Sequence, residues 1–131
     1  TRLLSEAAAK ARLAAMGVAV PRGVAAPGLA ELARRIDGVP RPFALKGLGF
    51  AHKTEAGAVR LHLASLDGQA EMPGATGYLA EEMILGGVAE VLVGLARDPV
   101  YGVTITLAMG GVAAELLADT VTLVAPATRI E

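Results

Sequence analysis

The sequence predicts an α+β domain in which two helices precede a mostly antiparallel sheet. An alanine-rich stretch opens the chain, and a second helical pattern follows Pro27 and Gly28. From residue 43 onward, short apolar runs alternate with Gly and Asp-Pro turn signals, which are typical of strands. Helices followed by runs of strands indicate the α+β class. We expect one domain over 1–131, with a helical part at about 1–40 and a strand-rich part at 41–131.

The first predicted helix begins after Ser5, because serine is a favourable N-cap. It ends at Gly17, where a C-terminal glycine is expected. Residues 18–21 then predict a short edge strand that Pro21 ends. A second helix is expected over about 29–36, where apolar residues recur on one side.

The remaining elements are predicted as strands because each is a short apolar run bounded by turn residues. They are expected at 43–46, from Val59 onward, and at 77–83, 89–95, 103–109 and 121–124. Residues 113–118 are ambiguous between helix and strand, and their periodicity alone favours a helix.

Composition excludes several classes of protein. A net charge of −1 and an aromatic content of 3% argue against nucleic-acid binding. No uninterrupted apolar run reaches the about 18 residues of a membrane span, and the first residues lack a signal-peptide pattern. The chain has no cysteine, which excludes disulfides and suits a cytoplasmic protein.

The run 44–61 is the most informative feature, because a polar loop lies there between two predicted strands. It combines an ammonium at Lys46, an imidazole at His52 and several glycines that free backbone N–H groups. An imidazole can act as base or nucleophile, and an ammonium neutralises phosphate oxygens. The residues therefore indicate a phosphate-handling site.

Ala44-Leu45-Lys46 and the loop His-Lys-Thr-Glu-Ala-Gly-Ala-Val at 52–59 resemble the ATP-grasp domain of ADP-forming acyl-CoA synthetases, relatives of succinyl-CoA synthetase. The second glycine of that family's pattern is Ala58 here. Further similar segments follow in the family's order, at 4–21, 78–83, 90–94, 97–102, and from Gly110-Gly111 through Pro126. The resemblance thus covers nearly the whole chain.

The resemblance implies that Lys46 contacts the nucleotide phosphates, and that Lys53 and Thr54 hold phosphate oxygens. It implies that His52 takes a phosphoryl group from a phosphohistidine on a partner domain and passes it to ADP, with Glu55 fixing the imidazole tautomer. The simpler alternatives are a solvated lysine at a strand end and an ordinary surface-loop histidine.

The segment Tyr78–Met83 resembles the family's adenine hinge. In that resemblance Glu82 meets the adenine amino group, backbone groups of Met83 and Leu85 make the remaining adenine bonds, and Glu90 belongs to the nucleotide site. The alternative is a charged edge residue beside a core methionine.

Glu115 and Asp119 are the expected Mg²⁺ ligands, because magnesium prefers carboxylate oxygens completed by phosphate oxygens. Two solvated acids one turn apart are an equally good interpretation. Asp98 precedes a proline and is expected to open a turn.

Two other features of the sequence give weaker indications of function. Gly47-Leu-Gly49-Phe-Ala-His52 mimics a dinucleotide-binding loop but lacks the third glycine and a following helix. His62 lies on a predicted strand without a surrounding motif and is interpreted as structural.

The resemblance implies an acid–CoA ligase that uses ATP/ADP and Mg²⁺. Its CoA-binding and ligase part, which would take CoA and a small carboxylic acid, is expected on a partner domain or subunit, in an oligomer. Two alternatives stay open: a regulatory domain of a fused protein acetyltransferase, or a degenerate interaction domain that has lost nucleotide binding.

We also expect the chain to be a partial domain. It begins at Thr1, the stretch 66–75 is short, and only twelve residues follow Asp119. Phosphoryl transfer requires a nucleotide clamped between two lobes, so the isolated fragment is expected to be inactive.

Overall fold

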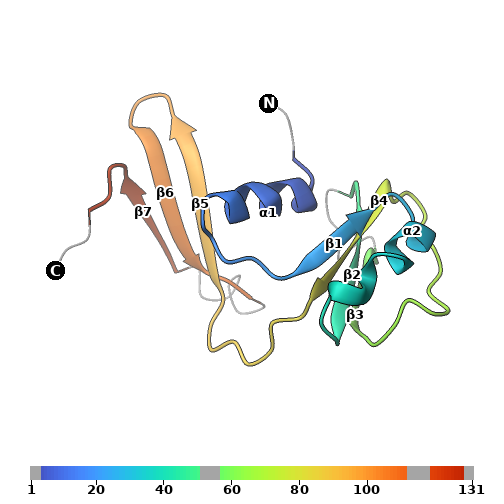
Figure 1. Ribbon diagram of the computed structural model, residues 1–131. Coiled ribbons are helices and arrows are strands. Elements are labelled where there is room, and N and C mark those ends of the chain that lie inside the picture. The colour runs from blue at the N-terminus through green and yellow to red at the C-terminus, as the bar shows by residue number, and fades with distance from the viewer. Residues whose placement is uncertain (1–3, 51–56, 112–118, 129–131) are drawn as a thin grey trace. The chain divides into compact units, whose positions relative to one another are not determined.

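The computed structural model describes residues 4–50, 57–111 and 119–128. These residues form two compact units, Thr1–Leu85 and Gly86–Glu131, each considered by itself. Strands dominate both units, as Figure 1 shows. No helix in the described part of the chain is long and apolar enough to cross a membrane.

The first unit is a four-stranded antiparallel sheet with helices on it (Figure 1). The strand order is β1-β4-β2-β3. The strands are β1 (Gly23–Ala26), β2 (Phe43–Leu48), β3 (Val59–Leu63) and β4 (Gly77–Glu82), and the helical segments are α1 (Glu6–Ala15), α2 (Leu29–Ala33) and the 3₁₀ turn η1 (Ile36–Gly38).

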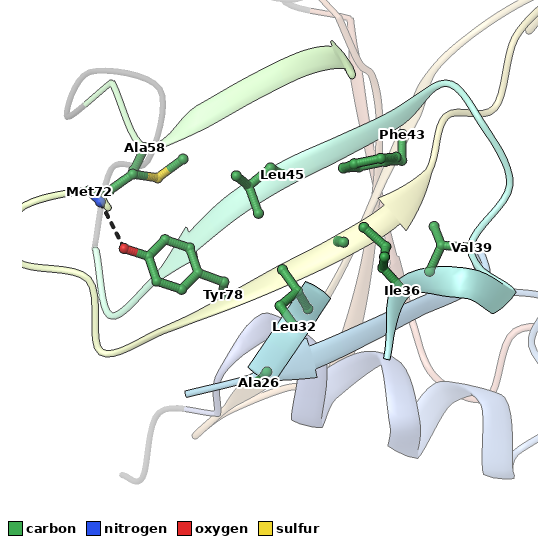
Figure 2. Close-up of a cluster of buried hydrophobic side chains, with 10 residues drawn as sticks. Ala26, Leu32, Ile36, Val39, Phe43, Leu45, Ala58, Met72 and Tyr78 are labelled. Atoms are coloured by element: carbon green, nitrogen blue, oxygen red, sulfur yellow. Dashed lines mark hydrogen bonds between the residues drawn. The ribbon is translucent and has the colours of Figure 1, made fainter. Parts of the chain in front are cut away.

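One face of this sheet carries the hydrophobic core. Side chains of β2 and β4 pack there with α2 and η1, and Figure 2 shows Phe43, Leu45 and Tyr78 in this cluster. The hydroxyl of Tyr78 accepts a hydrogen bond from the Met72 N–H at 2.7 Å. This bond satisfies the polar end of a buried aromatic ring. The central strands therefore hold their alternate residues against a packed interior.

The helix α1 starts as predicted, because the Ala8 N–H donates to the Ser5 Oγ at 3.2 Å. It ends before Gly17, whose φ of +84° suits a glycine. The structure describes every residue of α1, and none of them is buried. The second predicted helix is shorter than expected: α2 stops at Ala33, and a separate 3₁₀ turn contributes the buried Ile36.

The strand predicted at 18–21 is wrong. The first strand is β1, and it begins at Gly23, which pairs with Glu81 of β4. Proline has no N–H to donate, so Pro21 cannot extend the ladder, and pairing starts after it. The Glu82 N–H does reach the Arg22 carbonyl at 2.8 Å.

The second unit is a three-stranded antiparallel sheet in the order β5-β6-β7. Its strands are β5 (Val91–Asp98), β6 (Gly102–Met109) and β7 (Thr120–Val124). Asp98 opens the β5–β6 turn as predicted, since its Oδ1 accepts from the N–H groups of Val100 and Tyr101 at 2.8 and 2.9 Å. Among the described residues of this unit, none is buried.

The other predicted strands are confirmed within a few residues at each end. The ambiguous stretch 113–118 lies outside the described residues.

Candidate functional site

Lys46 lies on the face of the sheet opposite the core. Side chains alternate along a strand, and Phe43 and Leu45 point into the core, so Lys46 faces the other way. Glu81 of β4 shares that face, because it is paired with Ala44 while Lys46 is paired with Leu79. The Lys46 Nζ forms an ion pair with the Glu81 Oε1.

Two residues of α1 complete a cluster of four charges, Glu6, Lys10, Lys46 and Glu81, called the lysine–glutamate cluster below. The Glu6 Oε1 accepts from the Lys46 Nζ at 2.7 Å and from the Lys10 Nζ at 2.9 Å. Each lysine also binds a different oxygen of Glu81. The Glu81 side chain is 5% exposed, and the other three are 22–25% exposed.

The cluster keeps Lys46 charged. Burial alone lowers the pKa of the Lys46 ammonium, but hydrogen bonds and charges from Glu6 and Glu81 outweigh it and raise the pKa above its usual value. The Lys46 ammonium is therefore partly buried, and it stays protonated at neutral pH.

The backbone of β1 makes room for Glu81. Gly23 lies opposite Glu81 in the β1–β4 pair. A Cβ added at Gly23 would lie 2.8 Å from the Ala80 carbonyl oxygen and 2.9 Å from the Glu81 Cβ, so a side chain there would require the strands to move. Between α1 and the sheet, a cavity of about 240 Å³ opens beside Lys10 and Glu81.

Glu82 lies on the other face. It is paired with Phe43, and its carboxylate accepts from the Arg22 N–H at 2.8 Å and from the Arg22 Nε at 3.1 Å. The backbone N–H of Arg22 lowers the pKa of Glu82; partial desolvation opposes this shift, and the guanidinium adds to it. Lys46 and Glu82, predicted to serve one nucleotide, thus present their side chains on opposite faces.

Met83 and Leu85, the other residues predicted to bind the adenine, have surroundings different from those of Glu82. The Met83 N–H donates to the Pro42 carbonyl at 3.3 Å, and the Met83 Sδ accepts from the His62 N–H at 3.2 Å. Leu85 is exposed. The backbone N–H of His62 is therefore part of a structural contact with Met83.

In the second unit, Glu90 borders a tight glycine turn. Its carbonyl accepts from the Gly110 N–H at 2.8 Å. Gly111 has a φ of +79°, and a Cβ there would lie 3.0 Å from the Glu90 Oε2. The Glu90 carboxylate therefore lies close to the backbone of Gly111, where a side chain would crowd it.

Asp119 lines a hollow of about 190 Å³ together with side chains of β5, β6 and β7, and its carbonyl accepts from the Met109 N–H at 3.3 Å. Within the described ranges, no three His, Cys, Asp or Glu side chains gather as a metal site.

Five predicted site residues lie outside the described residues: His52, Lys53, Thr54, Glu55 and Glu115. Their roles stay predictions. The described strands on either side of the 51–56 segment are adjacent, since Lys46 of β2 is paired with Val59 of β3.

Sequence reasoning missed three members of the lysine–glutamate cluster. Glu6 and Lys10 have the i,i+4 spacing of a helix ion pair, which was a readable signal. Glu81 gave no such signal, because its partners are set by the register between β2 and β4 and by where α1 packs.

A family model described as an ATP-grasp domain matches residues 1–131. An acetate–CoA ligase (ADP-forming) I of Archaeoglobus fulgidus is 34% identical over 61% of this chain, which is 13% of that protein. The beta subunit of acetate–CoA ligase (ADP-forming) I of Pyrococcus furiosus is 28% identical over 98% of this chain and 62% of that subunit.

Solved structures of an acetyl-coenzyme A synthetase 1 of Ca. Korarchaeum cryptofilum are similar in fold. One, with coenzyme A and Ca-AMPCP, has a TM-score of 0.78 at 28% identity and covers 95% of this chain and 61% of that one. Another, with coenzyme A and Mg-AMPPCP, has its phosphohistidine segment pointing towards the nucleotide-binding site. Its TM-score is 0.75 at 30% identity, over 96% of this chain and 58% of that one. This chain therefore spans less than two thirds of each of these proteins.

Proposed function

The chain belongs to the ATP-grasp domain family, and from this premise we propose that it is the ATP- and ADP-binding part of an ADP-forming acyl-CoA synthetase. The overall reaction would be acid + CoA + ATP ⇌ acyl-CoA + ADP + phosphate. The single observation that supports it best is the half-buried, charged Lys46 on an otherwise apolar strand. The relatives that act as ADP-forming acetate–CoA ligases support the reaction class.

Lys46 would meet the nucleotide phosphates. An ammonium positioned on a rigid strand lowers the repulsion between the polyphosphate and an incoming nucleophile. The raised pKa of Lys46 ensures that the positive charge is present at neutral pH.

His52 would carry the phosphoryl group. A neutral imidazole nitrogen attacks the phosphorus of a phosphohistidine on the partner, the old P–N bond breaks, and a new one forms on His52. A terminal oxygen of ADP then attacks, the bond to His52 breaks, and ATP results. Lys53 and Thr54 would hold the phosphate oxygens, and Glu55 would fix the imidazole tautomer. The phosphohistidine segment of the archaeal synthetase supports such a route.

The adenine would lie at the end of β4, near Glu82, Met83 and Leu85, and the nucleotide would pass around this end, because Lys46 and Glu82 face opposite sides of the sheet. The Glu82 carboxylate uses one bond on each oxygen for Arg22 and keeps lone pairs for an adenine amino group. Glu90 would be a further nucleotide-binding residue.

Mg²⁺ would be held by Asp119 and Glu115. Asp119 suits it, because a hard carboxylate beside a hollow can serve a cation that takes only one or two protein ligands and phosphate oxygens for the rest. When bound, the ion would neutralise charge on the phosphates.

CoA and a small carboxylic acid would bind on a CoA-binding domain or partner subunit, in a cytoplasmic oligomer. We expect the 131 residues alone, given ATP, Mg²⁺, CoA and short-chain acids, to form no acyl-CoA above background. A regulatory domain of a fused protein acetyltransferase, or an interaction domain without nucleotide binding, would be the alternatives.

Calorimetric titration of the chain with ATP, ADP and adenosine tests the nucleotide site. Lys46→Gln should weaken ATP about tenfold, the value of a charge-assisted hydrogen bond, while leaving adenosine unchanged. Arg34→Gln is the matched control, since it removes an exposed cation at the end of α2. Equal ATP affinity in Lys46→Gln and the parent chain would place the phosphates elsewhere.

The phosphoryl step is tested in the complete enzyme. His52→Ala should abolish ATP formation from acyl-CoA, ADP and phosphate while leaving ADP affinity within a few-fold. Retained turnover in that variant would remove His52 from the route. Absence of any nucleotide binding by the parent chain would favour the interaction-domain alternative.

A further inference from the structure

One oxygen of Glu6 lies between two ammonium groups. The Oε1 accepts from the Lys46 Nζ at 2.7 Å and from the Lys10 Nζ at 2.9 Å. The two lysines come from different elements, β2 and α1, and converge on a single anionic atom. Charge-assisted bonds of this length also join ammonium groups to phosphate oxygens.

Glu81 forms ion pairs with both lysines and so holds their ammonium groups in place. It is the most buried member of the cluster and gives one oxygen to each lysine. These two bonds do not involve Glu6, so both ammonium groups keep a partner if the Glu6 carboxylate leaves. With Glu6 in place the cluster carries two positive and two negative charges. Without it, the cluster has one positive charge in excess.

Glu6 is the more exposed of the two carboxylates in the cluster. It lies in the first turn of α1, its side chain is 24% exposed, and α1 has no buried residue along its described length. A change of side-chain rotamer turns the carboxylate toward water without moving the helix. The cavity of about 240 Å³ that Lys10 and Glu81 line offers space next to the Lys10 side of the cluster.

We propose that Lys10 is a second phosphate-binding residue, and that Lys10 and Lys46 form a two-ammonium site in which the Glu6 carboxylate is the internal occupant that a nucleotide phosphate displaces. The proposal rests on the proposed function, because it takes Lys46 to meet the nucleotide.

The physical reason is charge. A terminal phosphate carries more negative charge than a carboxylate and has several oxygens, so it binds both lysines at once and outcompetes Glu6. Glu6 therefore favours phosphate ligands: a ligand without a phosphate gains nothing that offsets breaking the bonds of Glu6 to Lys10 and Lys46. Adenosine is therefore excluded from the site, while ATP and inorganic tripolyphosphate enter it.

Calorimetric titrations of the chain with ATP, tripolyphosphate and adenosine test this. Lys10→Gln should weaken ATP and tripolyphosphate about tenfold, whereas Glu6→Gln should tighten both by a few-fold, since a neutral amide competes less well. Lys10→Arg should recover most of the lost affinity. Arg12→Gln, an exposed cation on the same helix, is the control and should change neither ligand.

The double variant Glu6→Gln/Lys10→Gln separates binding from helix support. If Lys10 binds phosphate, removing it in the Glu6→Gln background still weakens ATP; if Lys10 only holds Glu6, it does not, and the proposal is overturned. The far-ultraviolet circular dichroism of each variant reports whether α1 is retained, and Glu6→Gln gives the opposite sign of effect without removing a lysine.

The outcomes distinguish the two proposals. Loss of ATP affinity in Lys46→Gln but not in Lys10→Gln overturns the two-ammonium site and leaves the proposed function standing. Unchanged ATP affinity in Lys46→Gln overturns the nucleotide assignment on which both depend. A tenfold loss in both lysine variants, with tighter binding in Glu6→Gln, supports both.

Discussion

The two units of this chain both contain an antiparallel sheet, yet among the described residues only those of the first unit form a buried core. In the first unit, β2 and β4 place Phe43, Leu45 and Tyr78 in a core that excludes water. In the second unit, the described residues of β5, β6 and β7 form a full ladder but bury nothing. Backbone hydrogen bonds contribute little net free energy, so the ladder alone does not make a stable fold.

The difference originates in the side-chain pattern. β2 places the charged Lys46 on the face opposite its core residues Phe43 and Leu45, whereas β5 has Val91, Leu92 and Val93 in succession, with 61, 59 and 62% exposed. Consecutive apolar residues give both faces of a strand the same character. Exposed apolar surface of this extent is typical of regions that pack against other protein.

The largest expected difference between the units is in core truncation. Leu45→Ala removes a side chain that is 0% exposed and should cost about 2–5 kcal/mol in the free energy of unfolding, through lost burial and a cavity. Leu95→Ala truncates the same residue type at 73% exposure and should stay within about 0.5 kcal/mol. Urea unfolding followed by circular dichroism measures both. Comparable losses would show that the second sheet is packed in solution.

An intermediate effect is expected from single hydroxyl groups. Tyr78→Phe leaves the Met72 N–H without its acceptor in the core and should cost about 1–3 kcal/mol. Thr106→Val removes an exposed cross-strand contact, in which the Oγ1 atoms of Thr106 and Thr122 lie 3.3 Å apart, and should stay within about 0.5 kcal/mol. Thermal unfolding of the two variants at one pH compares them directly. A harmless Tyr78→Phe would mean that water reaches Met72.

The smallest effects concern two carboxylates, one in each unit. The pKa values of Glu82 and Asp98 are both lowered, first of all by backbone N–H groups. Each contact therefore adds stability above the carboxylate's unfolded pKa, and this is lost as pH falls through the lower folded value. Only Glu82 also faces a guanidinium, from Arg22, so added salt should raise its pKa more than that of Asp98. Carboxyl-carbon NMR titrations at two salt concentrations test this; equal salt responses would contradict it.

Local signals in the sequence predicted most of the secondary structure. Ser5 and Gly17 bounded α1, and short apolar runs located the strands, because caps and periodicity act over a few residues. The prediction at 18–21 failed since apolar residues before a proline resemble a strand, while the actual pairing begins where β4 offers partners. The early end of α2 likewise reflects packing of Ile36 rather than propensity.

The candidate site was less accessible from sequence. Lys46 was predicted to be a site residue, but its partners Glu6 and Glu81 are 40 and 35 residues away along the chain. No local rule links such positions, because strand register and helix packing decide them together.

The adjacent acids Glu81 and Glu82 also determine how β4 aligns. Glu81 meets lysines on one side of the sheet, and Glu82 meets Arg22 on the other. A slip of β4 by one residue would exchange their sides, leaving each carboxylate away from its cations. It would also turn Tyr78 out of the core. Two neighbouring carboxylates whose cations lie on opposite faces of the sheet thus disfavour any slip of β4 by one residue between β1 and β2.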